Sequence, residues 1–153
     1  MKKLIALFLV LLMIPFSAFA DATHIFEEID VAIVVPDEMV ELDISDDPDG
    51  TLMLACLSKD ETLSMVVHMD TAEGLTLDDM KAELEQTEGI TSSGITEING
   101  LPTLFLVGET EEYSFVSYFY VANGWYINFS FCFTTEEAAA LSGQIMETLA
   151  PAV

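Results

Sequence analysis

Basic residues are scarce in this sequence. Of its 153 residues, 27 are Asp or Glu and only 4 are Lys or Arg, which gives a formal charge of −23 at pH 7. Nucleic acids and anionic lipid surfaces are negatively charged, so they would repel a chain this acidic. We therefore exclude both classes of partner.

Cysteines and catalytic signatures are also scarce. The two cysteines, Cys56 and Cys132, are too few for a disulfide-dense miniprotein, and the sequence leaves open whether they form a disulfide or stay as free thiols. The chain contains no Walker loop and no GxGxxG, GxSxG, HExxH or CxxC motif. The sequence accordingly identifies no catalytic residue and no cofactor, although an enzyme could still assemble its groups from distant positions.

Long apolar runs occur only at the start of the chain. Lys2 and Lys3 precede an apolar run over residues 4–14, Pro15 interrupts it, and small residues lead up to Ala20. This order is typical of a secretory signal peptide over residues 1–20, cleaved after Ala20. The run is shorter than the roughly 20 residues that span a bilayer, so we expect no transmembrane segment after processing.

The remainder, residues 21–153, is expected to be an exported bacterial protein, secreted or periplasmic. It keeps all 27 acidic residues against Lys59 and Lys81 alone, so its formal charge is −25. Hydrophobic residues make up 52% of the sequence, which is too many for an acidic disordered tail. We expect one folded domain.

Turn signals indicate a mainly antiparallel sheet. Asp47-Pro48-Asp49-Gly50, Asn99-Gly100 and Asn123-Gly124 are residue combinations that favour chain reversal. Between them the apolar pattern predicts strands over residues 25–35, 41–45, 51–57, 63–70, 95–98, 101–107, 113–121 and 125–133. A loop is expected over residues 91–94.

Two stretches have helical periodicity. The first begins after Thr76, whose hydroxyl can cap the first turn, and ends before Gly89. The second begins at Thr134, in a capping box with Glu137, and runs to Pro151. The apolar stripe of this second helix is expected to cover the aromatic face of strand 125–133.

The order of these elements carries a resemblance. A capped helix, the hairpin TEINGLPTLFLVGETEE, the aromatic hairpin YSFVSYFYVANGWYINFSF and the final helix TTEEAAALSGQIMETL together resemble the DcrB-like secreted domains of unknown function. That resemblance implies an α+β fold of the PsbP/Mog1 type, with an antiparallel sheet of about six or seven strands flanked by helices. It also implies a binding or accessory role, and it transfers no ligand residues.

Two acidic segments are candidate sites. The first contains Asp43, Asp46, Asp47 and Asp49, and its oxygen ligands suit a hard cation such as Ca²⁺. As an EF-hand it would lack the first Asp and the final bidentate Glu, and a solvated acidic turn explains the same residues. The second, at residues 109–112, could bind a basic partner, supply a catalytic carboxylate or protect a strand edge.

Tyrosines form the other candidate site. Strand alternation places Tyr118 and Tyr120 on one face, and these residues with Tyr126 are predicted to contribute to an aromatic ligand-binding surface. The competing interpretation is that the first helix covers them.

The function that we expect is therefore a non-catalytic exported binding or accessory module. Its partner would be a cationic protein or peptide or a cell-envelope component. The alternatives are an extracytoplasmic enzyme that uses loop carboxylates and a weak Ca²⁺-binding protein.

Overall fold

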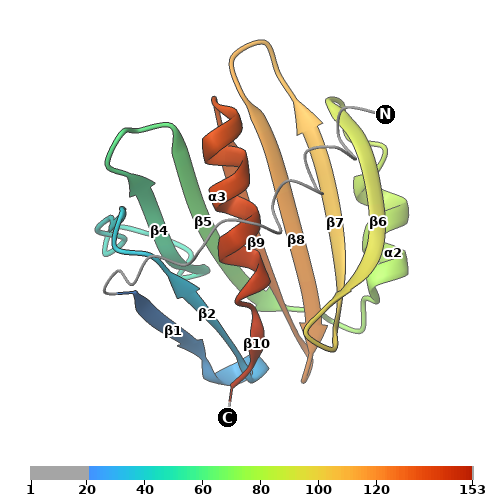
Figure 1. The fold of residues 1–153 in the computed structure, drawn as a ribbon. Coiled ribbons are helices and arrows are strands. Elements are labelled where there is room, and N and C mark those ends of the chain that lie inside the picture. The colour runs from blue at the N-terminus through green and yellow to red at the C-terminus, as the bar shows by residue number, and fades with distance from the viewer. Residues whose placement is uncertain (1–20, 153) are drawn as a thin grey trace.

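The computed structural model describes residues 21–152, and the expected signal peptide lies outside them. A seven-stranded antiparallel sheet dominates the fold (Figure 1). Its strands, in spatial order, are β3 (Met39–Glu41), β4 (Leu52–Ser58), β5 (Leu63–Thr71), β9 (Trp125–Phe133), β8 (Ser114–Ala122), β7 (Leu101–Glu109) and β6 (Ile90–Ile98). The expected α+β architecture is confirmed.

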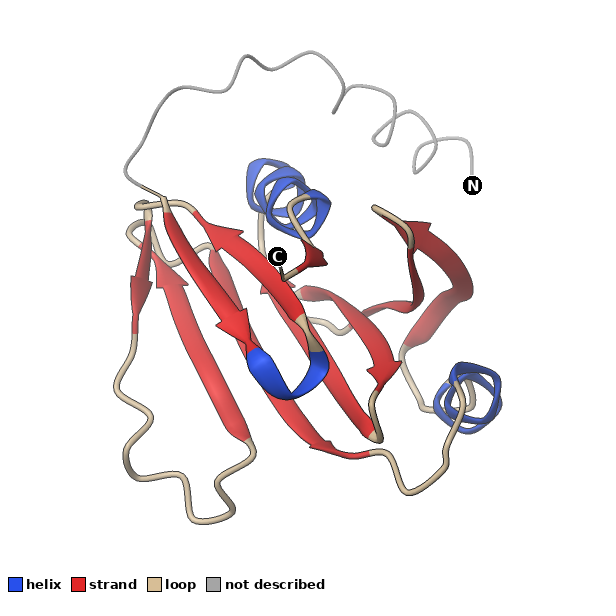
Figure 2. Cartoon of the chain, turned by 90° about the horizontal axis from the view of Figure 1, so that it is seen from below, coloured by secondary structure: helices blue, strands red, loops and turns tan. Residues whose placement is uncertain are grey.

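A second, small sheet packs on the long one. It consists of β1 (Ala22–Phe26), β2 (Val31–Val35) and β10 (Ala150–Pro151). The helices α3 (Glu136–Glu147) and α2 (Leu77–Leu84) lie on opposite sides of the long sheet (Figure 2). No described helix has the length and apolar character needed to cross a membrane.

The main core lies between the long sheet, α3 and the small sheet. Phe129 and Phe131 of β9 are fully buried there, and Ile145 of α3 is 1% exposed. Phe26 of β1 meets Phe129 edge-on, with ring centroids 5.9 Å apart. The prediction that the C-terminal helix covers the aromatic face of β9 is confirmed.

The opposite face of the sheet has a smaller core. Met80 of α2 is buried there with Leu104 and Leu106 of β7, and Phe119 and Tyr126 pack around them. Thr76 and Asp79 form a capping box at the start of α2, as Thr76 was predicted to do for the first turn.

The two Asn-Gly turns have the predicted role. Asn99 and Gly100 join β6 to β7, Asn123 and Gly124 join β8 to β9, and all four residues have positive φ. This is the backbone of a two-residue turn whose twist matches that of the paired strands.

Several predicted boundaries were wrong, including the end of the first helix, which lies at Leu84 and not just before Gly89. The strand expected over residues 25–35 is a hairpin, because η2 (Glu27–Ile29) and the left-handed residue Asp30 reverse the chain. The strand expected over 41–45 ends at Glu41, because Asp43 accepts a hydrogen bond from the Ser45 amide and holds a turn.

Two further errors concern β6 and α3. The loop expected over residues 91–94 belongs to β6, where the ring of Phe105 lies against Gly94 and fills the space of the missing side chain. The N-cap of α3 is Thr135, which accepts from the Ala138 amide, and the helix ends at Glu147 so that residues 150–151 can pair with β2.

Candidate functional site

The predicted tyrosine site is divided between the two faces of the sheet. Tyr118 and Tyr120 pack against the main core on the α3 side, whereas Tyr126 packs against the small core under α2. The Tyr118 ring meets Phe131 edge-on at 6.3 Å. Burial, followed by the nearby charge of Glu147, raises the pKa of Tyr118 to about 12. The three residues therefore do not form one continuous surface.

The first acidic segment hydrogen-bonds to its own backbone. Asp47 accepts from the Leu52 amide at 3.0 Å, and this bond is the main cause of its lowered pKa. The Ser45 amide lowers the pKa of Asp43 in the same way. Among residues 21–152, no set of three or more His, Cys, Asp or Glu side chains is placed to hold a metal ion. In this geometry Asp43, Asp46, Asp47 and Asp49 are not gathered around one point.

The second acidic segment stands in solvent. Glu109, Glu111 and Glu112 are all exposed, and Thr110 organises the turn by accepting from the amides of Glu112 and Tyr113. This arrangement leaves the three carboxylates free to meet a partner, and it does not enclose a substrate.

The two cysteines are free thiols on opposite faces of the sheet. Cys56 pairs in register with Met65 and lies in the main core, whereas Cys132 pairs with Ser64 on the other face. Burial, with a smaller contribution from the charge of Glu41, raises the pKa of Cys56 to about 11. Burial also raises the pKa of Cys132. Neither thiol is activated as a nucleophile.

A hydroxyl and amide network occupies the uncovered part of the α2 face. Ser117 and Ser130 are 2.9 Å apart, and Ser130 donates to Asn128 at 2.8 Å. His68 pairs with Asn128 in the strand register. His68 and Asp70 alternate along β5 and so share this face, but within the described residues Asp70 accepts from the Thr71 amide at 2.7 Å and makes no hydrogen bond to His68. The two side chains therefore do not form a catalytic dyad.

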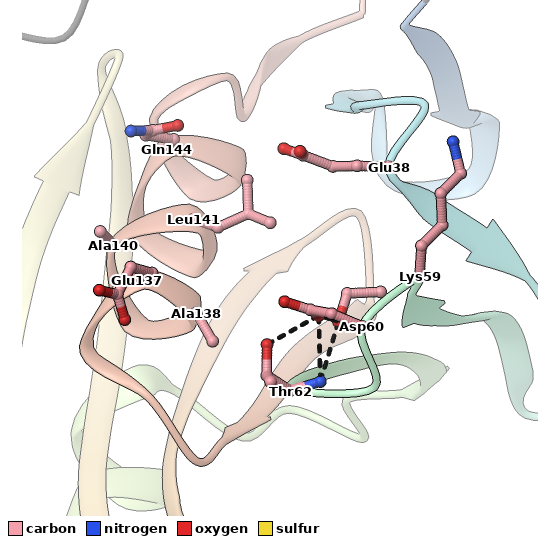
Figure 3. A pocket seen from close by; sticks show the side chains of 10 residues that line it. Glu38, Lys59, Asp60, Thr62, Glu137, Ala138, Ala140, Leu141 and Gln144 are labelled. Atoms are coloured by element: carbon pink, nitrogen blue, oxygen red, sulfur yellow. Dashed lines mark hydrogen bonds between the residues drawn. The ribbon is translucent and has the colours of Figure 1, made fainter.

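A groove of about 500 Å³ separates the N-terminal half of α3 from the β4–β5 turn (Figure 3). Three carboxylates line it: Glu38 from the turn before β3, Asp60 from the β4–β5 turn and Glu137 from α3. Leu141 and Ala138 supply an apolar wall. The side chain of Lys59 extends from the same turn as Asp60 (Figure 3).

The three carboxylates have different roles. Asp60 accepts from the Ser58 hydroxyl at 2.6 Å and from the Thr62 hydroxyl at 2.8 Å, and these bonds lower its pKa. Asp60 therefore stabilises the β4–β5 turn. Glu38 and Glu137 are exposed, and within residues 21–152 their side-chain carboxylates accept no hydrogen bond, although the main-chain oxygen of Glu38 accepts from the Lys59 amide. The two carboxylates could therefore bind an ammonium or guanidinium group.

The sequence did not predict this groove. Its lining residues come from the turn before β3, the β4–β5 turn with the end of β4, and α3, and they meet only because α3 packs across β5 and β9. The pattern that could have suggested it is the acidic first turn of α3, where Glu136 and Glu137 follow the N-cap.

Comparison with known proteins gives a fold and no family. No protein-family model matches the chain, and no curated protein matches it in sequence. The solution structure of cyanobacterial PsbP (CyanoP) from Synechocystis sp. PCC 6803 is similar to it, with a TM-score of 0.66 over 91% of this chain and 96% of that chain. The chain has a PsbP-like fold. Sequence identity to that structure is 10%, so the likeness concerns the backbone architecture alone.

Proposed function

We propose that this protein is an exported, non-catalytic binding or accessory module for a cationic partner. The observation that carries the proposal is the distribution of charge. Residues 21–153 contain 27 acidic residues and two lysines, and one of these, Lys81, is already paired with Glu85 at 2.7 Å. The negative electrostatic potential of such a chain attracts cationic proteins and peptides and repels anionic ones.

The positions of the carboxylates support binding over catalysis. Among residues 21–152, every carboxyl group whose pKa departs clearly from its ordinary value departs downward: Asp43, Asp47, Asp60, Asp79 and Glu85. A general acid at neutral pH needs a raised pKa. The acidic loops on which an enzyme would depend are solvent-exposed, which favours binding over the enzyme alternative.

The groove beside α3 is one surface that fits the proposal. Glu38 and Glu137 lie on its two sides, and the apolar wall of Ala138 and Leu141 can accept the aliphatic part of a lysine or arginine side chain. A single basic side chain could therefore be held between the helix and the β3 side of the groove.

Export and family membership belong to the same proposal. The cationic start, apolar run and small residues of positions 1–20 support export. Membership of the DcrB-like domains is supported by the order of elements and by the PsbP-like fold. An accessory role at the cell envelope would follow from both.

The test is affinity capture by the chain 21–153 from an extracytoplasmic extract of its native host. A second bait, an unrelated protein of matched size and negative charge, controls for simple electrostatic attraction. We expect the chain to retain at least one basic protein that the control bait does not. Identical capture by both baits would contradict the proposal.

Paired variants then locate the contact. The double variant E38Q/E137Q removes two charges from the groove, and E27Q/E28Q removes two exposed charges from η2. We expect the first pair to reduce capture several-fold more than the second. Equal losses would mean that the groove is not the contact.

A further inference from the structure

The outer edge of β6 is a nine-residue strand with no partner strand among the described residues. The Asn99-Gly100 turn makes Ile98 and Leu101 a hydrogen-bonded pair, and such pairs alternate along an antiparallel ladder. The N–H and C=O groups of Ser93, Ile95 and Glu97 therefore point away from β7. Pro102 of β7 lies opposite Glu97 in a non-hydrogen-bonded pair, so the missing N–H of this proline costs no hydrogen bond between β6 and β7.

This edge has few of the features that usually prevent strand addition. Natural edge strands are commonly short, charged, bulged or interrupted by proline. β6 contains no proline and no lysine, its register shift is confined to its start near Thr91, and Ile95 is 43% exposed. The edge at the other end of the sheet, β3, has only three residues.

The local charge distribution differs from that of the rest of the chain. From Gly89 to Gly108 the only charged residue is Glu97. Beside this strand lies the acidic end of α2, where the Glu85 carboxylate accepts from the Ser93 hydroxyl at 3.2 Å and from the Lys81 ammonium at 2.7 Å. The side chain of Ile95 is on the same face, since it pairs with Leu104 under α2. The edge thus offers free backbone groups next to carboxylates.

We infer that β6 binds an extended cationic segment of the partner as an additional antiparallel strand. Residues of that segment that hydrogen-bond to Ser93, Ile95 and Glu97 would direct their side chains to the α2 side, toward Glu85 and Glu97. Lysine or arginine at alternate positions fits this geometry. The inference rests on the proposed function, and it adds the partner's conformation and the strand that receives it.

Charge complementarity favours this occupant over a second copy of the chain. Antiparallel pairing of two β6 strands would bring two α2 segments to the same side of the joined sheet. Each segment carries Asp78, Asp79, Glu83, Glu85 and Glu88 against Lys81. Like charges facing across such an interface oppose the pairing.

The experiment uses the chain 21–153 and the peptide acetyl-Lys-Val-Lys-Val-Lys-Val-Lys-amide. The control peptide has the same sequence, but the backbone amide nitrogen of each lysine is methylated. This change keeps the side-chain charges and removes the backbone N–H groups needed for the proposed pairing. NMR hydrogen exchange measures each backbone amide of the protein. We expect the first peptide to slow exchange of the Ser93, Ile95 and Glu97 amides at least tenfold and the control peptide to leave them unchanged.

A variant of the protein tests strand addition independently of the control peptide. Ile95→Pro removes one outward N–H and no hydrogen bond to β7, and we expect it to bind the first peptide at least tenfold more weakly. Three results would overturn the inference: equal binding of both peptides, protection confined to other residues, or self-association of the free chain that Ile95→Pro abolishes.

Failure of strand addition at β6 can be distinguished from failure of the proposed binding function. If the basic partner captured from the extract is retained equally by the Ile95→Pro variant, the binding function stands and strand addition at β6 fails. If the peptide protects the three amides but the chain captures no specific partner, the edge binds cationic strands and the proposed function fails.

Discussion

The two faces of the seven-stranded sheet differ in how they are covered. The α3 face is covered by a helix and a second sheet, and it contains the fully buried Phe129 and Phe131. The α2 face is covered by one helix of eight residues over the β6–β8 part of the sheet. Beyond that helix it shows partly exposed hydroxyl, amide and imidazole groups. We conclude that stability depends mainly on the first face, which leaves the second face and its edge available for contacts.

The largest expected effect comes from removing the cover of the α3 face. A chain ending at Phe133 loses α3 and β10, and this exposes Phe129, Phe131 and the underside of β2. We expect a molten product that binds a hydrophobic dye and has lost its near-ultraviolet circular dichroism. A shortened chain that unfolds cooperatively and has native spectra would contradict the conclusion that stability depends mainly on the α3 face.

Truncating one aromatic side chain on each face should lower the free energy of unfolding by different amounts. Phe129→Ala leaves a cavity in the main core, and we expect a loss of about 3–5 kcal/mol in the free energy of unfolding. Phe119→Ala acts on a half-buried ring over the smaller core, and we expect roughly 1–2 kcal/mol. Urea denaturation measures both, and equal losses would remove the distinction between the faces.

The α2 face is tightly packed at Gly108. A Cβ added at Gly108 would lie 2.2 Å from the Phe115 ring and 2.6 Å from the Gly89 carbonyl oxygen. A backbone atom cannot swing aside, so we expect Gly108→Ala to cost about 1–3 kcal/mol. Gly94→Ala is the matched control: its added Cβ would lie 2.9 Å from the Phe105 ring alone, and it should cost less in the same denaturation experiment.

The smallest effect concerns the cap of α2. The Thr76 hydroxyl and amide both donate to Asp79 and lower its pKa in the folded protein. A lowered folded-state pKa stabilises the protein above the unfolded value of about 3.9, and this contribution is lost as the pH falls through the folded-state pKa. We therefore expect Asp79→Ala to lower the melting temperature at pH 7 and to have a progressively smaller effect as the pH falls through the folded-state pKa of Asp79.

The matching control for that experiment is Asp78→Ala, which removes a carboxylate from the same turn outside the capping box. If its effect on the melting temperature matched that of Asp79→Ala at every pH, the cap would contribute nothing specific.

Local signals in the sequence were sufficient for much of the fold. The Asn-Gly turns, the cap at Thr76 and the alternating aromatic residues of β9 each depend on neighbours close in sequence, and each was predicted. The hairpin at residues 22–35 was missed because its reversal depends on Asp30 in a left-handed conformation, within a run that otherwise resembles one long strand.

Sequence reasoning was weaker for the candidate sites. Alternation correctly placed Tyr118 and Tyr120 together, but only the tertiary packing shows that the main core receives them. The groove beside α3 joins two turns and a helix that are far apart in sequence, so the acidic first turn of α3 indicates only one of its sides. The edge position of β6 was equally hidden, because strand order depends on which strands pair across the sheet.

Amide hydrogen exchange of the unliganded chain 21–153 tests the division between the two faces most directly. Exchange through global unfolding should govern β5, β9 and α3, whereas α2 and β6 should exchange through local openings of lower free energy. We predict that the slowest amides of α2 and β6 exchange at least tenfold faster than those of β9. Equal protection of all five elements would show that the two faces unfold as a single unit, and it would contradict the account.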